Sequence, residues 1–404
     1  MRTVLFVGAG RHQRRAIAQA KAMKLRVAAV DRNPDAPGLA EADLTRIVDF
    51  ADVDAVLRAT RRIKLDGVLT VSADRAVPVV AAVAEARGLP GIGTETAHLM
   101  THKVAMRRRL ADAGVPQPRF AAVRNLAETR RAAEAVGFPA VLKPADSGGQ
   151  RGVFRVESLD DVDTHLHEAL AASPSEEAIL EEFVDGTELN GIVVARDGET
   201  IPLTLSDRMR PPGIGFGVGW IHVYPPTIPP GQLAESERIA EHTVHALGLR
   251  TGVAFPQLIA APDGRVVVVE CAARIPGGQM ADLVRVAVGV DLVELQLRMT
   301  LGDDLPDELV RPRFSQPLAI RFFTAEPGPL PAGRVARIGS LDKVLAFPGV
   351  VQAELYLQQG EVIRPVRLDG DRRGYVIATA RTNLDALDRA EAASRLLDVE
   401  VDGA

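Results

Sequence analysis

A lysine-bearing apolar strand that runs into a glycine-rich loop is the strongest chemical signal in the sequence. The segment 140–153 reads A-V-L-K-P-A-D-S-G-G-Q-R-G-V, so Lys143 shortly precedes Ser147, Gly148 and Gly149. The backbone N–H groups of such a loop, together with one ammonium group, can face a polyphosphate. The alternative is a hairpin turn with a lysine in its stem. We interpret the segment as a phosphate grip that lacks a Walker signature.

Lysine is rare in this chain, which makes each lysine informative. Only six of the 48 basic residues are lysines, and the others are arginines. Where charge alone suffices the chain uses arginine, so a lysine indicates a need for a compact ammonium group. Lys103 and Lys143 stand out by this criterion because their surroundings are apolar or rich in glycine.

A second motif combines carboxylates with apolar residues. The run I-L-E-E-F-V-D-G-T-E places Glu181 and Glu182 at a strand end, before the apolar pair Phe183 and Val184 and a third carboxylate, Glu188. Adjacent carboxylates are unfavourable unless hydrogen-bond donors meet them. An exposed hairpin would explain each carboxylate singly but explains their order less well.

A third motif could bind a metal ion. Gln257 and Glu270 lie on successive predicted strands around a turn at 263–264, so their side chains can converge in a hairpin. Oxygen ligands on rigid strands suit Mg²⁺ that bridges phosphates. Arg274 follows and can clamp a carboxylate or a transferring phosphoryl group. We interpret Cys271 as a core residue because no partnering base is evident.

The elements that must position these groups begin with a βαβ series. Residues 3–93 alternate short apolar runs with helical stretches, which indicates a parallel sheet. The turn at Gly8 and Gly10, with Asp31 after the second strand, matches part of a dinucleotide fingerprint, but Gln13 occupies the third glycine position. A generic strand-to-helix turn, a turn that binds a small anion and a nicotinamide site all remain open.

Two α+β pieces are predicted to follow. One helix over 94–114 ends at a glycine and two nearby prolines, and short strands with two helices then form a small lid. The expected domains are 1–93 (Rossmann-like), 94–302 (with the lid at about 118–185) and 303–404 (a final α+β piece).

Composition narrows the class of protein. The net charge of -5 and the pI near 6.0 provide no broad basic surface, so we expect no nucleic acid partner, and we interpret the arginines at 107–109 as a solvated helix face. A single cysteine fits a reducing cytoplasm, and no apolar run approaches the ~18 residues of a membrane helix. We expect a cytoplasmic protein without a membrane partner, and a homodimer by default.

Together these motifs resemble the ATP-grasp superfamily, and within it the carboxylate–amine ligases that include bacterial L-amino acid (dipeptide) ligases. The resemblance covers nearly the whole chain and implies an α/β and α+β fold in which a Rossmann-like domain precedes two pieces that clasp ATP. It implies a ligase that joins a small-molecule carboxylate to an amine, both amino acids, through an acyl phosphate. The implied cofactors are ATP and Mg²⁺, with Mn²⁺ as an alternative metal.

The resemblance also assigns roles to individual residues. Glu181 to Val184 look like the adenine hinge, and Glu188 matches the ribose-binding carboxylate. The implied ATP-binding residues are Lys103, Lys143, Ser147, Gly148, Gly149, Glu181, Glu182, Phe183, Val184 and Glu188. The implied metal ligands are Gln257 and Glu270, the implied catalytic residues are Arg274 and Lys143, and the residues implied near the substrate are His222, Arg274, Gly277 and Gly278.

Two departures from the family pattern keep alternatives open. Gln257 stands where most members carry a glutamate, and Ala272 stands where many carry asparagine, although the run E-C-A-A-R-I-P-G-G is similar to that of dipeptide-ligase-like members. A purine-pathway or carboxylase-type enzyme would share the ATP residues, and a non-catalytic ATP-binding protein would tolerate Gln257. For His222, a packed histidine is the alternative to a substrate contact.

Overall fold

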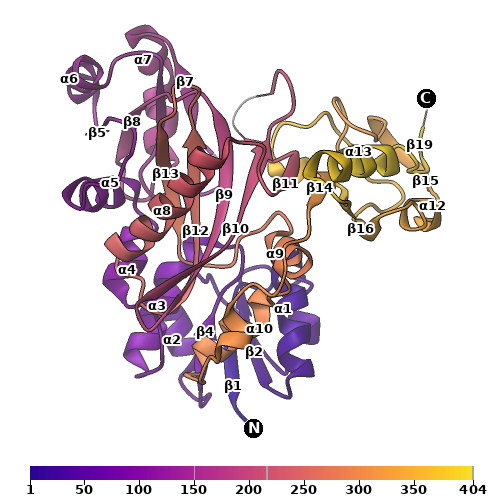
Figure 1. Cartoon of the computed structure of the whole chain (residues 1–404). Coiled ribbons are helices and arrows are strands. Elements are labelled where there is room, and N and C mark those ends of the chain that lie inside the picture. The colour runs from indigo at the N-terminus through magenta and orange to yellow at the C-terminus, as the bar shows by residue number, and fades with distance from the viewer. Residues whose placement is uncertain (150, 215–216, 403–404) are drawn as a thin grey trace.

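The N-terminal strands form a parallel sheet, and the strands that follow form antiparallel sheets (Figure 1). The computed structural model describes residues 1–149, 151–214 and 217–402. Gln150 of the glycine loop, and Gly215 and Phe216 of the Pro/Gly-rich segment after Arg210, lie outside these residues. No described helix is both long and apolar enough to cross a membrane.

The parallel sheet has the strand order β3-β2-β1-β4. Strands β1, β2 and β4 are almost fully buried apolar runs, as expected for strands that are covered on both faces, whereas β3 at the edge of the sheet is mostly exposed. This region comprises β1 (Thr3–Val7), α1 (Arg11–Ala22), β2 (Arg26–Asp31), β3 (Leu44–Ile47), α2 (Val53–Thr60), β4 (Gly67–Leu69), α3 (Val77–Ala86), α4 (Thr94–Leu99) and α5 (Lys103–Asp112).

The lid is a small antiparallel sheet, ordered β5-β8-β6-β7, with two helices. Both helices begin at capping side chains, since Asn125 accepts from the backbone N–H of Glu128 and Ser158 from that of Asp161. The elements are β5 (Phe120–Val123), α6 (Leu126–Val136), β6 (Ala140–Pro144), β7 (Phe154–Val156), α7 (Leu159–Ala171) and β8 (Ala178–Glu182).

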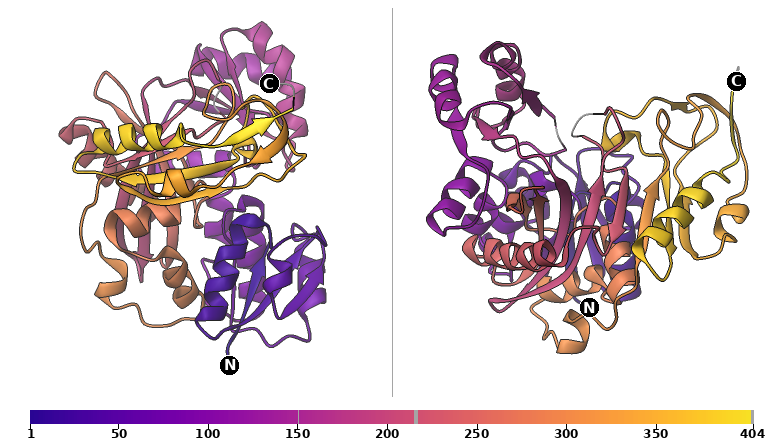
Figure 2. Two further views of the ribbon diagram at one scale, coloured as in Figure 1. Left: turned by 90° about the vertical axis from the view of Figure 1, so that its right-hand side faces the viewer. Right: turned by 45° about the horizontal axis from the view of Figure 1, so that its top comes forward.

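A large antiparallel sheet connects the lid region to the C-terminal part (Figure 2). Within the described ranges its order is β13-β12-β9-β10-β11-β14-β18-β16. The elements up to its centre are β9 (Thr187–Arg196), β10 (Glu199–Met209), β11 (Ile221–Tyr224), α8 (Pro230–Ala246), β12 (Gly252–Ala260), β13 (Val266–Ala272), α9 (Met280–Val288) and α10 (Leu292–Thr300). The remaining elements are α11 (Asp307–Val310), β14 (Leu318–Phe322), β15 (Gly333–Ile338), α12 (Asp342–Leu345), β16 (Val350–Leu355), β17 (Val362–Ile363), β18 (Gly374–Thr379), α13 (Asn383–Ser394) and β19 (Val399–Val401).

One hydrophobic core holds the parallel sheet against the large sheet. Ile17 of α1 and Leu69 of β4 belong to the same buried cluster as Leu283 of α9 and Ile192 of β9. Burial of a side chain of this size contributes about 1.5–3 kcal/mol. This shared core fixes the carboxyl ends of the parallel strands beside the large sheet, where the candidate site lies.

Two expectations about secondary structure were wrong. The single helix over 94–114 is two helices, because His102 adopts an extended conformation and its ring caps α5 by accepting from Ala105 N. Strand β10 was absent from the expected elements, and the structure accommodates its Pro202 beside a register shift between Pro202 and Thr204.

Candidate active site

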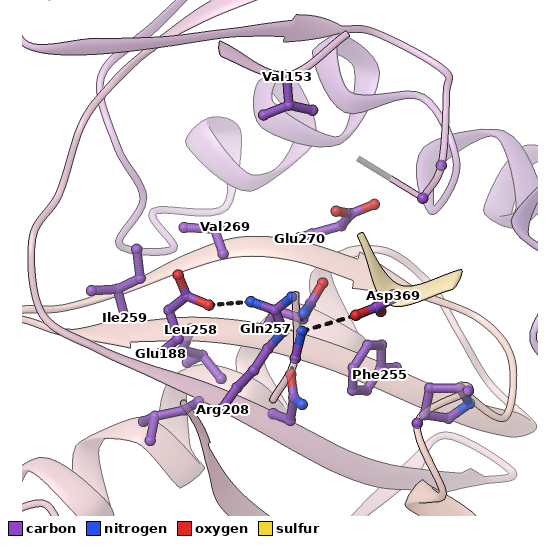
Figure 3. A pocket seen from close by; sticks show the side chains of 18 of the residues that line it. Val153, Glu188, Arg208, Phe255, Gln257, Leu258, Ile259, Val269, Glu270 and Asp369 are labelled. Carbon is purple, nitrogen blue, oxygen red and sulfur yellow. Dashed lines mark hydrogen bonds and ion pairs between the residues drawn. The ribbon is translucent and has the colours of Figure 1, made fainter. Parts of the chain in front are cut away.

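A single cleft of about 430 Å³ lies between the lid, the large sheet and the ends of the parallel strands (Figure 3). All of the residues to which the resemblance assigned a role line it. They are Lys103, Lys143, Ser147, Gly148, Gly149, Glu181, Glu182, Phe183, Val184, Glu188, His222, Gln257, Glu270, Arg274, Gly277 and Gly278.

Lys103 connects α5 to the segment with the glycine loop and to Glu270 on β13. The helix break places it as the first residue of α5, where its backbone N–H donates to Ala145 O at 2.6 Å. Its ammonium group donates to Ser147 O at 3.0 Å and lies 3.4 Å from Oε1 of Glu270. The side chain is buried, and these two contacts direct its positive charge at the loop and at β13.

A buried cluster of charges holds Lys143 in place. Its Nζ lies 2.7 Å from Oε2 of Glu181, whose Oε1 accepts from Nε of Arg107 at 2.8 Å. Burial alone would raise the pKa of Glu181, but Arg107 and Lys143 outweigh it and lower that pKa to about 2. Burial also lowers the pKa of Lys143, and the adjacent Glu181 only partly opposes the effect.

This cluster corrects the interpretation of the arginines at 107–109. Arg107 is 0% exposed, whereas Arg108 beside it is exposed. Arg107 also donates to the carbonyl oxygens of Val268 and Val269, at 3.0 and 2.7 Å. The side chain therefore ties α5, β8 and β13 together beneath the cleft and is not part of a solvated face.

The carboxylate of Glu188 faces a guanidinium from the strand that was not expected. Nη1 of Arg208, on β10, donates to Oε2 of Glu188 at 2.5 Å, and Figure 3 shows the two side chains facing each other within the cleft. Arg210 lies 3.0 Å from the other oxygen of the same carboxylate. Glu182, by contrast, accepts from Arg119 at 3.1 Å near the outer edge of the lid.

Gln257 and Glu270 are direct partners in the β12–β13 hairpin. The amide nitrogen of Gln257 donates to Oδ1 of Asn190 at 3.1 Å, so the amide oxygen is the polar atom left for a cation. No group of three or more His, Cys, Asp or Glu side chains that could hold a metal exists in the described parts of the chain. The pair fits Mg²⁺, which is commonly held by one or two carboxylates plus substrate phosphates. Cys271 is buried, and burial raises the pKa of its thiol.

Arg274 is oriented by a carboxylate from the parallel-sheet region. Its Nε donates to Oδ1 of Asp74 at 2.5 Å. Burial alone would raise the pKa of Asp74, but Arg274 lowers it below its ordinary value. Within the described chain, the buried Nη1 of Arg274 has no hydrogen-bond partner, which leaves a donor available to an anion.

His222 lies on β11 and lines the cleft. Nδ1 is 3.5 Å from Nδ2 of Asn190, and the ring stands edge-on to Phe322 with centroids 5.6 Å apart. Burial, and then the nearby Arg372 and Arg208, lower the pKa of His222 to about 3, so the ring is neutral at pH 7. Gly277 lies beside Ser72, and Gly278 lies beside His222.

Several lining residues were missed from the sequence. They are His12, Ser72, Asp74, Asn190, Arg208, Asp369 and Arg372. Asp74 could have been found, because it follows the last parallel strand and ligands bind at the carboxyl ends of such strands. Asp31 does not line the cleft: its carboxylate accepts from Ala9 N and Asn33 N, which closes the first turn internally.

Comparisons with known proteins agree with this architecture. Residues 102–308, just over half of the chain, match the family described as carbamoyl-phosphate synthase L chain, ATP binding domain. The chain belongs to this family and so to the ATP-grasp superfamily of ATP-dependent ligases that form C–N bonds, and the expected fold class is confirmed. Residues 321–402 match a second family model, L-amino acid ligase C-terminal domain 2.

Individual relatives are distant. The chain is 28% identical over 410 residues to the formate-dependent phosphoribosylglycinamide formyltransferase of Ignicoccus hospitalis, covering 98% of this chain and 95% of that one. It is 24% identical over 285 residues to the L-arginine-specific L-amino acid ligase of Bacillus subtilis, covering 68% and 66%. The L-amino acid ligase of Bacillus licheniformis superposes with a TM-score of 0.84 at 21% identity, over 100% of this chain and 99% of that one.

Proposed function

We propose that this ligase activates a small carboxylic acid with ATP and transfers the acyl group to an amine, with amino acids as the substrate class. One observation carries the proposal: Lys103, Lys143, Glu270 and Arg274 all line one cleft, and Nη1 of Arg274 has no hydrogen-bond partner among the described residues. The match of residues 321–402 to L-amino acid ligase C-terminal domain 2 supports amino acids as substrates.

The proposed reaction has two steps. An oxygen of the substrate carboxylate attacks the γ-phosphorus of ATP, the bond from this phosphorus to the bridging oxygen breaks, and ADP leaves. The nitrogen of the amine then attacks the acyl carbon, the bond from this carbon to the phosphate oxygen breaks, and inorganic phosphate leaves while the amine loses its proton to solvent.

The residues of the chain act mainly by positioning and by electrostatics. Lys103 donates to Ser147 of the glycine loop and Lys143 lies on the strand before it, so both can neutralise phosphate oxygens. Nη1 of Arg274 can donate to an oxygen that gains charge in the first step. A bound Mg²⁺, held through Glu270 and Gln257, would neutralise phosphate oxygens further. The adenine would lie at 181–184, where the lid meets the cleft, and the ribose near Glu188.

The test is a screen for ADP release. The protein, ATP and Mg²⁺ are incubated with pairs of amino acids, and the product of each active pair is identified by mass. ADP release that requires both substrates, together with a product lighter by one water than their sum, supports the proposal. ATP binding without ADP release for any pair would instead support a non-catalytic ATP-binding protein.

A second candidate function has its own support. The likeness to the Ignicoccus enzyme extends over 98% of this chain, so formate as the acid and phosphoribosylglycinamide as the amine belong in the same screen. Activity with that pair alone would replace amino acids as the substrate class while leaving the two-step reaction in place.

A further inference from the structure

Asp74 contacts two parts of the cleft that lie far apart in the sequence. Its Oδ1 accepts from Nε of Arg274, and its Oδ2 lies 2.8 Å from the position that a Cβ atom on Gly148 would occupy. The carboxylate therefore lies between the proposed catalytic guanidinium and the glycine loop, although it comes from the segment after β4.

The segment that carries Asp74 is fastened to the strand end that carries Arg274. Val71 forms a parallel bridge with Ile275, and the backbone N–H of Ser72 donates to Ile275 O at 2.9 Å. Ser72 has a φ of 60°, a left-handed conformation that residues other than glycine rarely adopt. This turn directs the chain so that Asp74 lies under the loop.

Two adjacent glycines of the loop are required for different reasons. At Gly148 the φ is not left-handed, and the three described atoms nearest to an added Cβ belong to the side chain of Asp74, at 2.8, 3.3 and 3.4 Å. At Gly149 the φ is 72°, and an added Cβ would meet no atom of the other described residues, its chain neighbours aside, within 4 Å. A side chain at 148 therefore collides with Asp74, whereas one at 149 strains only the backbone.

We propose that Asp74 is a positioning residue that sets both the seat of the glycine loop and the orientation of Arg274. This inference rests on the proposed function in one respect, namely that the loop and Arg274 face the phosphates of ATP. Because Asp74 holds Nε of Arg274, the unpartnered Nη1 is kept at a fixed place beside the seated loop. The position of the glycine loop and the position of the Arg274 guanidinium thus depend on the same carboxylate.

The charge and the bulk of Asp74 have separable effects. Asp74→Asn keeps the shape under the loop but removes the negative charge opposite Arg274. We expect kcat for ADP release to fall by about 10- to 100-fold, while KM for ATP stays within about threefold. Asp74→Ala removes both charge and bulk, so it should lower kcat similarly. A residue that only supported the fold would change both parameters in parallel or lower the melting temperature.

The decisive experiment measures ADP affinity for Gly148→Ala in three backgrounds: unsubstituted, Asp74→Asn and Asp74→Ala. A side chain forced into a packed site costs about 1–3 kcal/mol, so Gly148→Ala should weaken ADP binding roughly 5- to 150-fold in the first two backgrounds. In the Asp74→Ala background the loss should shrink to within about twofold. Gly149→Ala is the matched control, and its loss should be the same in all three backgrounds.

Equal losses for Gly148→Ala in every background would overturn the inference. Hydrogen exchange of the amides at 147–149 in the ligand-free protein provides the same comparison without nucleotide. Exchange should be faster in Gly148→Ala and return to the unsubstituted rate in the double variant with Asp74→Ala. Failure of the unsubstituted protein to bind ADP would therefore count against the proposed function, while the exchange data still decide the role of Asp74.

Discussion

The buried charge cluster under the cleft leads to a sharp prediction about stability. Arg107→Ala removes a fully buried guanidinium that bonds to both oxygens of Glu181, at 2.8 and 3.2 Å, and to two backbone carbonyls. In the variant, Glu181 keeps its ion pair with Lys143 but loses the one with Arg107, and the two carbonyl oxygens lose this hydrogen-bond donor. Breaking a buried ion pair by removing one partner costs about 3–5 kcal/mol, so we expect a loss of that size in the free energy of unfolding.

The assay is urea unfolding at pH 7, with Arg108→Ala as the control. Arg108 is the next residue on the same helix and is exposed, so its substitution should change the free energy of unfolding by no more than about 0.5 kcal/mol. The unfolding midpoint should fall for Arg107→Ala with an unchanged slope. A loss below about 1 kcal/mol for Arg107→Ala would refute the account of this cluster.

Three further predictions concern the cleft. Lys143→Ala should lower kcat for ADP release by at least about 100-fold, measured by coupled assay, and retention of more than a tenth of the activity would remove this residue from the mechanism. Gln257→Glu adds a second carboxylate beside Glu270 and should lower the Mg²⁺ concentration for half-maximal activity by about tenfold; an unchanged Mg²⁺ dependence would exclude position 257 as a ligand. The pKa of His222 is lowered to about 3 in the folded protein. Below about pH 6.5 the unfolded state therefore binds a proton at His222 that the native state does not bind. The free energy of unfolding then falls by about 1.4 kcal/mol for each pH unit of acidification. His222→Gln should reduce this loss between pH 6 and 4 in urea titrations, and parallel curves would show that His222 is not buried and neutral.

Residues whose positions depend on local chain geometry could be predicted from the sequence. Gln257 and Glu270 come together because a short turn joins their strands, and a register shift between Gln257 and Leu258 completes the pairing. Lys143 lies on a strand that runs straight into the glycine loop, so its place follows from its own segment. The parallel sheet was evident from its alternating apolar runs and helices.

Residues whose positions depend on tertiary packing could not be predicted from the sequence. Arg107 resembles its two neighbours in sequence, and only the packing of α5 against β8 and β13 buries it. Arg208 lies on β10, and Pro202 interrupts the strand pattern of this segment. Asp74 is 200 residues from Arg274 along the chain, so no local sequence pattern predicts their contact.

The central claim is that a substrate carboxylate attacks the γ-phosphorus of ATP in this cleft. The most direct measurement uses an acid labelled with ¹⁸O in its carboxylate and follows the mass of the released inorganic phosphate. The account predicts that each phosphate carries one ¹⁸O atom from the acid, formed only when the amine and Mg²⁺ are present. Phosphate without ¹⁸O, released alongside the coupled product, would contradict the proposed chemistry.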